Sequence, residues 1–182
     1  MRTLAMDPGT RYTGWAVLQD GEYADSGIIE ADGALPWPQR LRALRAILVQ
    51  LVACHAPDLV CIEHTQVHEG LWAAAKDDPA KLQELAPRLR AQARATRQTE
   101  ELCGVIMEVA AQALAVTVRP SDTDGLRALG LKRGATDRAV SEAANRLFGL
   151  RLLVKEHHEA RAIGIGLAGA ARLRLRKAGV PA

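Results

Sequence analysis

The first thirty residues alternate between short apolar runs and turn residues, a pattern typical of consecutive β-strands. An apolar run over Arg2–Met6 is broken at Asp7-Pro8-Gly9, and a second run over Thr13–Leu18 carries β-branched and aromatic residues. The turn Gln19-Asp20-Gly21 leads into a third run over Glu22–Ala31. The pattern therefore predicts three strands joined as an antiparallel meander.

A helix and a buried strand follow the meander. Leucine, isoleucine and valine recur every three or four residues between Leu41 and Val52, which predicts an amphipathic helix that ends at Ala56-Pro57-Asp58. The next segment, Leu59–Ile62, is apolar without alternation. Continuous apolarity is typical of a strand covered on both faces, so we expect helices on both sides of the sheet.

The rest of the chain predicts one more strand among helices. Residues 64–89 show only a weak pattern, interrupted by Asp77-Asp78-Pro79. The remaining elements are expected as a helix over Gln92–Ala113, a strand over Ala115–Val118, a basic loop or short turn over Gly125–Gly134, a helix capped by Thr136 or Asp137, and a helix over Glu156–Arg176. This order predicts an α/β fold on a mixed sheet, and we expect a single domain over residues 1–182.

The composition is that of a globular protein. Hydrophobic residues make up 48% of the chain and charged residues 25%, and no apolar run is long enough to cross a membrane. A basic region followed by a long apolar stretch is absent from the start of the sequence, so the expected location is the cytoplasm. Cys54, Cys61 and Cys103 lack C-x-x-C spacing, which predicts buried, reduced thiols rather than a zinc site.

Basic side chains gather in two stretches although the formal net charge is only +3. They are Arg88, Arg90, Arg94 and Arg97 in the middle of the chain, and Arg172, Arg174, Arg176 and Lys177 near its end. Such clusters are compatible with a phosphate backbone as partner. They are equally compatible with solvated helix faces in an arginine-rich protein.

Carboxylates stand at the ends of two apolar strands. Asp7 directly follows Leu4-Ala5-Met6, and Glu63 follows Val60-Cys61-Ile62 in the same way. A carboxylate that closes a buried strand is desolvated unless it is paired or bound to a metal ion. Hard cations such as Mg²⁺ prefer carboxylate oxygens from separate elements. Asp7 in Asp-Pro-Gly is also compatible with an ordinary turn.

A third acidic group opens the last helix. Glu156 and Glu159 are three residues apart and so share a helix face, although acids in a first turn also interact favourably with the helix dipole. Small residues at Ala160, Gly164 and Ala168 predict close packing of this helix against the sheet. Converging carboxylates of this kind can hold two divalent ions for phosphodiester cleavage. The candidate catalytic and metal-binding residues are Asp7, Glu63, Glu156 and Glu159.

The motifs around these acids resemble those of the RuvC-type Holliday junction resolvases, the crossover junction endodeoxyribonucleases. The stretch from Met6 to Val17 resembles the family's opening hairpin, I-D-P-G-x-x-x-T-G-x-x-V, and Asp58–Glu63 resembles its second acidic strand. Val118-Arg119-Pro120 is similar to a later P-x-x-V-K segment. Glu159–Gly164 resembles the D-A-L-A-x-A helix, with Glu156 in the place of the preceding ligand.

The resemblance implies an RNase H-like fold, with a mixed five-stranded sheet flanked by helices. It implies a homodimer that resolves four-way DNA junctions by paired nicking in recombination and repair. It also implies that Asp7 bridges two Mg²⁺ or Mn²⁺ ions, with Glu63, Glu156 and Glu159 completing their shells.

The sequence departs from the family pattern at several positions. Glu159 is one methylene longer than the usual Asp, and His157 and His158 beside it are candidates to replace a carboxylate in the metal shell. Asp124 and Asp137 stand near positions where the family usually has lysines. The candidates for the missing positive charge are Arg138, Lys132 and Arg133, and Trp72 is either a base-stacking residue or a core tryptophan.

Three other functions stay open. The Asp7-Pro8-Gly9-Thr10 hairpin also resembles the phosphate-binding hairpin of actin-like sugar kinases and ATPases, although 182 residues are too few for the two domains of those proteins. The replaced acid and lysines fit a non-catalytic junction-binding relative. Because the acids specify phosphodiester chemistry and not the shape of the nucleic acid, an RNase H-like nuclease acting on RNA or on another branched DNA also fits.

Overall fold

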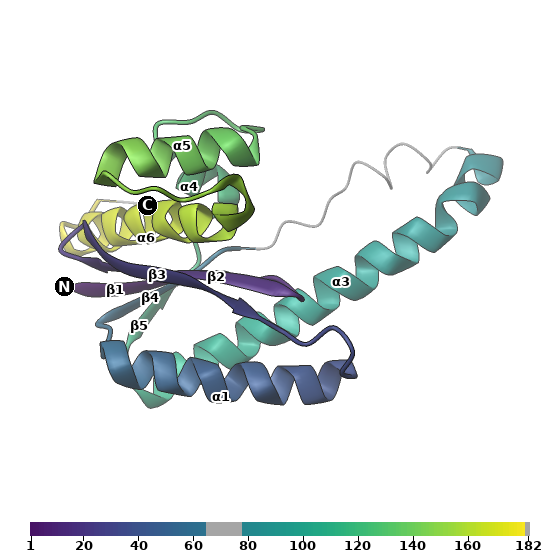
Figure 1. Ribbon diagram of the computed structural model, residues 1–182, viewed down its shortest axis with the longest axis horizontal. Helices are drawn as coiled ribbons and strands as arrows, with labels where there is room; N and C mark the ends of the chain where they lie inside the picture. The colour runs from purple at the N-terminus through teal and green to yellow at the C-terminus, as the bar shows by residue number, and fades with distance from the viewer. Residues whose placement is uncertain (65–77, 181–182) are drawn as a thin grey trace.

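A mixed five-stranded sheet lies at the centre of the molecule. The computed structural model describes residues 1–64 and 78–180 (Figure 1). The strands are β1 (Arg2–Asp7), β2 (Tyr12–Gln19), β3 (Glu22–Glu30), β4 (Leu59–Ile62) and β5 (Val116–Val118). They lie in the order β3-β2-β1-β4-β5, antiparallel through the meander and parallel from β1 to β5. The predicted strands and the mixed sheet are confirmed.

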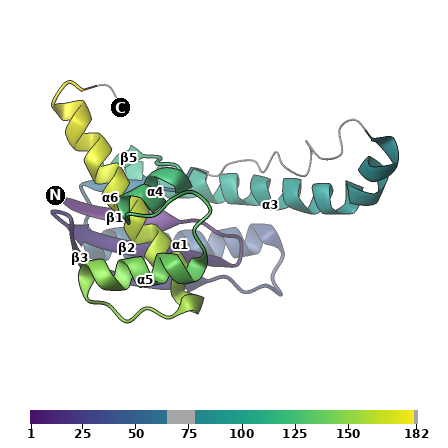
Figure 2. The same ribbon diagram turned by 90° about the horizontal axis from the view of Figure 1, so that it is seen from above.

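Helices cover both faces of this sheet. They are α1 (Trp37–His55), α3 (Pro79–Gln112), α4 (Asp122–Ala128), α5 (Asp137–Phe148) and α6 (His157–Lys177). Helices α1 and α3 lie on one face, while α6 lies on the other with α4 and α5 packed outside it (Figures 1 and 2). The first part of α3 extends well beyond the sheet in both views. Among the described residues, no helix is long and apolar enough to span a membrane.

The residues of β1 alternate between the two layers, as the period of a strand requires. Leu4 and Met6 pack in a core with residues of α1 and α3, whereas Ala5 belongs to a second cluster on the side of α6. Every residue of β4 is fully buried. The prediction that this strand is covered on both faces is therefore confirmed.

Helix α6 lies unusually close to the sheet because glycines remove the side chains that would separate them. A Cβ at Gly14 of β2 would run into the backbone carbonyl of His158 at the start of α6. A Cβ at Gly169 would collide with the Cys61 side chain of β4. The predicted close packing is confirmed, although Gly164 faces Gly125 of α4 rather than the sheet.

Two predictions of local structure are wrong. The Gly125–Gly134 segment is not simply a loop, since it begins inside α4, whose Leu126 is buried and whose seven residues are too few to show a helical period. Helix α3 begins at Pro79, capped by Asp78, rather than at Gln92. Its early residues are largely polar because they extend beyond the core, so the apolar pattern starts later.

Other local predictions are confirmed in part. Thr136 caps α5 by accepting a hydrogen bond from the backbone N–H of Ala139, as expected. Cys61 and Cys103 are buried free thiols, but Cys54 is exposed, because it lies on the outer side of the last turn of α1. Trp72 lies outside the described residues.

Replacing Gly14 by alanine should destabilise the protein by about 1–3 kcal/mol, because the added methyl group forces α6 away from β2. Urea unfolding followed by circular dichroism measures the change. Gly104→Ala is the matched control, because Gly104 is exposed in α3 with open space around it. That control should be neutral or stabilising by up to about 1 kcal/mol. Equal stability of Gly14→Ala and the wild type would contradict the close approach.

Candidate metal centre

Two carboxylates meet at the carboxyl edge of the sheet. Asp7 is the last residue of β1, and Glu63 follows the last residue of the parallel neighbour β4. The backbone N–H of Glu63 donates to the carbonyl of Met6 at 3.0 Å, which continues the ladder to this point. Both side chains project to the α6 face, as Ala5 and Cys61 do two residues earlier. The register of two parallel strands thus brings the predicted acids together.

The two carboxyl groups share one charge. Burial, followed by the hydrogen bond and the charge of Asp7, raises the pKa of Glu63 from its ordinary 4.5 to about 10. Burial also opposes ionisation of Asp7, but hydrogen bonds from His158 and Glu63 outweigh it and lower the pKa of Asp7. At neutral pH, Glu63 is therefore protonated and donates to an ionised Asp7.

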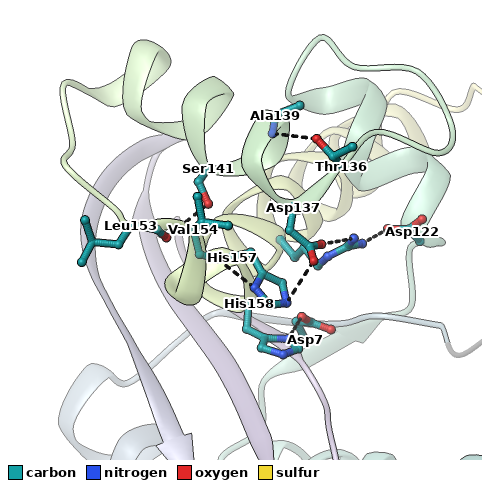
Figure 3. Close-up of polar contacts among 11 residues, drawn as sticks. Asp7, Asp122, Thr136, Asp137, Ala139, Ser141, Leu153, Val154, His157 and His158 are labelled. Atoms are coloured by element: carbon teal, nitrogen blue, oxygen red, sulfur yellow. Dashed lines mark hydrogen bonds and ion pairs between the residues drawn. The ribbon is translucent and has the colours of Figure 1, made fainter.

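His158 supplies the third group of the site. Its Nδ1 lies 2.6 Å from Oδ2 of Asp7, and the close-up shows the imidazole directed at that carboxylate (Figure 3). Since Asp7 is ionised, Nδ1 carries the hydrogen and donates it. The ring of His157 lies against that of His158, with 4.2 Å between centroids. Of the two histidines considered from the sequence, His158 is the one that contacts Asp7.

Glu156 and Glu159 are not brought to this cluster. Glu156 lies in the short 3₁₀ turn Val154–Glu156 and accepts a hydrogen bond from the backbone N–H of Leu153 at 2.7 Å. Glu159 accepts a 2.7 Å hydrogen bond from the Ser26 hydroxyl of β3. The start of α6 therefore directs His158 at Asp7, whereas Glu156 and Glu159 have other partners.

Arg161, which was not predicted from the sequence, acts through its charge on Asp7 and Glu63. It lies three residues after His158 and so shares a face of α6 with it. Its guanidinium donates to Asp122 at 2.7 Å and to Asp137 at 3.0 Å. Burial opposes its charge, but Asp137 and the charges of Asp122, Asp7 and Glu63 raise its pKa. The sequence offered one signal for Arg161, because it stands three residues after His158 and so lies on the same face of the helix.

Asp124 and Asp137, which stand near the positions of the family's lysines, and the candidate replacement Arg138 are all paired with other residues. Asp124 closes the capping box of α4 and accepts from Arg172 at 2.9 Å. Asp137 is paired with Arg161, and His157 lies 3.8 Å from the same carboxylate (Figure 3). Arg138 pairs with the exposed Glu142.

The donor set fits a cation, although no complete cage is formed. Within residues 1–64 and 78–180, no three His, Cys, Asp or Glu side chains are already grouped to hold a metal ion. Asp7 nevertheless contacts both Glu63 and His158, which provides two carboxylates and an imidazole in a chain. Buried Asp7 and partly buried Glu63 share one charge, and a divalent cation neutralises such a pair better than a proton does.

The amino-terminal part of the chain matches a known family in sequence. The family model described as crossover junction endodeoxyribonuclease RuvC matches residues 3–76. The relative of that name from Methylorubrum populi is 38% identical over 80 residues, 42% of each chain. The one from Acidiphilium cryptum is 37% identical over 79 residues, 41% of this chain and 47% of the relative. The match thus spans less than half the length of these relatives and includes Asp7 and Glu63 but not α6.

The fold is similar over nearly the whole chain. The structure titled T. thermophilus RuvC in complex with Holliday junction substrate has a TM-score of 0.71 at 15% identity and covers 96% of both chains. The yeast mitochondrial Holliday junction resolvase Ydc2 has a TM-score of 0.56 at 12% identity, over 98% of this chain and 82% of the other. The RNase H-like fold is confirmed, and the resemblance to the RuvC-type resolvases holds in sequence over residues 3–76 and in fold beyond them.

Replacing Glu63 by glutamine should make the metal-free protein more stable relative to the wild type, and this difference should grow as the pH rises. The wild type holds a proton on Glu63 up to about pH 10, whereas the unfolded chain releases it near 4.5, so this stability is present at low pH and is lost between those values. Glutamine donates to Asp7 without titrating. The melting temperature of Glu63→Gln minus that of the wild type, measured in chelator, should therefore increase from about pH 5 to pH 9 by several degrees.

The exposed Glu22 of β3 provides the control for this pH series, since Glu22→Gln should melt with the wild type at every pH. A difference between Glu63→Gln and the wild type that stays constant across the series would contradict the shared charge.

Proposed function

We propose that this chain is a divalent-metal-dependent endodeoxyribonuclease that resolves four-way DNA junctions by paired nicking in recombination and repair. The observation that carries the proposal is the contact of buried Asp7 with Glu63 and His158 at the carboxyl edge of an RNase H-like sheet. The sequence match over residues 3–76 to crossover junction endodeoxyribonucleases supports the same activity.

Asp7, Glu63 and His158 are the residues that would hold the ion. Asp7 is 7% exposed and lies between the other two groups, so it is the central ligand. When bound, a divalent ion lowers the pKa of a water molecule and polarises a phosphate ester. Binding of an ion would favour the ionised carboxylate of Glu63, whose proton would pass to solvent, and His158 would carry its hydrogen on Nε2 so that Nδ1 could face the ion. Glu156 and Glu159, which have partners elsewhere, are left out of the proposed ligand set.

The imidazole bears on the choice of ion. Carboxylate oxygens alone suit Mg²⁺, whereas an imidazole nitrogen favours divalent ions of the transition metals. A set of two carboxylates and one histidine accordingly favours Mn²⁺ over Mg²⁺ more than an all-carboxylate set does.

DNA with a four-way junction is the proposed partner, and the proposed assembly is a homodimer. The neighbour whose title names a Holliday junction substrate shares the fold over 96% of this chain. Two copies related by a two-fold axis would present two equal sites to a roughly symmetric junction, as paired nicks require. The basic residues on exposed parts of α3 and the end of α6 suit contacts with phosphates.

A non-catalytic junction-binding protein is the second candidate. One specific observation favours it, because the charged guanidinium of Arg161 acts on both Asp7 and Glu63 and so opposes the entry of a cation. This candidate predicts junction binding without cleavage by any ion.

Incubation with labelled four-way junctions, plain duplex and RNA, with Mg²⁺ or Mn²⁺, separates these functions. We expect symmetric nicks in the junction, with Mn²⁺ at least as effective as Mg²⁺. Asp7→Asn should lower the rate by at least about 100-fold while leaving junction binding, measured by gel shift, intact. The matched control is Asp32→Asn, a change in an exposed turn that should cleave as the wild type does.

Cleavage that survives in Asp7→Asn would contradict the proposed site. Binding of the junction without cleavage by the wild type would favour the non-catalytic candidate, and cleavage of RNA or of plain duplex in preference to the junction would replace the substrate.

A further inference from the structure

Arg161 brings a permanent positive charge to the edge of the metal centre. It projects from α6 one turn after His158, on the same face, and its side chain is only 23% exposed. Its charge acts on Asp7 and Glu63, the two carboxylates of the site. A surface arginine placed there for solubility would not be partly buried and paired with two acids.

The acids that hold Arg161 are themselves held in place. Asp122 and Asp137 are the first residues of α4 and α5, and the caps of these helices are Ser121 and Thr136. Ser121 also forms a β-bridge with His64, the residue after Glu63, which ties the start of α4 to the strand that carries the site. Two ion pairs from two helix starts therefore fix the position of the guanidinium. From that position its charge acts to lower the pKa of both Asp7 and Glu63.

We propose that Arg161 stands in for a second metal ion, so that each chain binds one divalent cation at Asp7, Glu63 and His158. The inference rests on the proposed function for the identity of that site, and it departs from the two ions that the family resemblance implies. The Arg161 guanidinium supplies a charge of +1 that needs no free ion, and Asp122 and Asp137 hold it through its two terminal amino groups. A second divalent ion would have to displace the guanidinium from Asp122 and Asp137, in a partly buried place where charge interactions are weakly screened.

The number and affinity of bound ions test this without any cleavage. Mn²⁺ titration, followed by electron paramagnetic resonance of the free ion and by calorimetry, should give one site per chain in the wild type. Arg161→Lys keeps the charge and should also bind one ion. Arg161→Gln removes the charge and should bind the ion about tenfold more tightly. Arg161→Asp adds a carboxylate to the cluster and should bind two ions per chain.

Arg172→Gln is the matched control. Arg172 also links α6 to α4, through Asp124, but lies away from Asp7 and Glu63. Its loss should lower stability without changing Mn²⁺ affinity. If Arg161 serves only to hold α4 and α5, Arg161→Gln will behave as this control does, and the proposal fails. Should Arg161→Asp not fold, the comparison of Arg161→Lys with Arg161→Gln decides.

Two ions bound to the wild type, or none, would also overturn the inference. Junction cleavage by the wild type, measured in parallel, separates this outcome from a failure of the proposed function. Cleavage with two ions bound refutes the role of Arg161 alone, whereas one ion bound without cleavage refutes the nuclease and leaves the role of Arg161 standing.

Discussion

The rest of the site depends on the forced proximity of two carboxyl groups in a place with little water. Asp7 and Glu63 end neighbouring parallel strands on the same face, so the backbone leaves them no freedom to separate. Two charges cannot be held there without compensation, and the metal-free protein provides a proton on Glu63 and a hydrogen bond from His158. The same pair of carboxyl groups attracts a cation. The pH dependence of folding stability and the proposed metal binding both follow from the close approach of these two carboxyl groups.

Helix α6 carries the side chains that compensate the charge of these carboxyl groups. Because Gly14 and Gly169 bring the helix into contact with β2 and β4, His158 reaches Asp7 from a rigid element rather than from a loop. Arg161 then follows on the same face and is anchored by the first residues of α4 and α5. A site built from a sheet edge and a packed helix keeps its groups within a small range of positions, as metal-assisted chemistry requires.

The sequence predicted the two acids that end neighbouring strands, but it left open which residue at the start of the last helix faces them. Asp7 and Glu63 were found because an acid that ends an apolar run must lie at a sheet edge. The start of α6 offered Glu156 and Glu159 as the acidic candidates, but a shift of one residue turns a helix by about 100° and exchanges Glu159 for His158. Composition could not reveal that phase, since it is determined by where the helix touches Gly14. Short α4 was missed for a related reason, because seven residues are too few to show a period.

The central claim is that one divalent ion is held by Asp7, Glu63 and His158. A crystal structure of the protein grown with Mn²⁺, with data collected near the manganese absorption edge, tests it most directly. We expect one anomalous peak per chain within bonding distance of these three side chains, with the Arg161 guanidinium beside it and free of metal. A peak bound instead by Glu156 and Glu159, or no peak near Asp7, would contradict it.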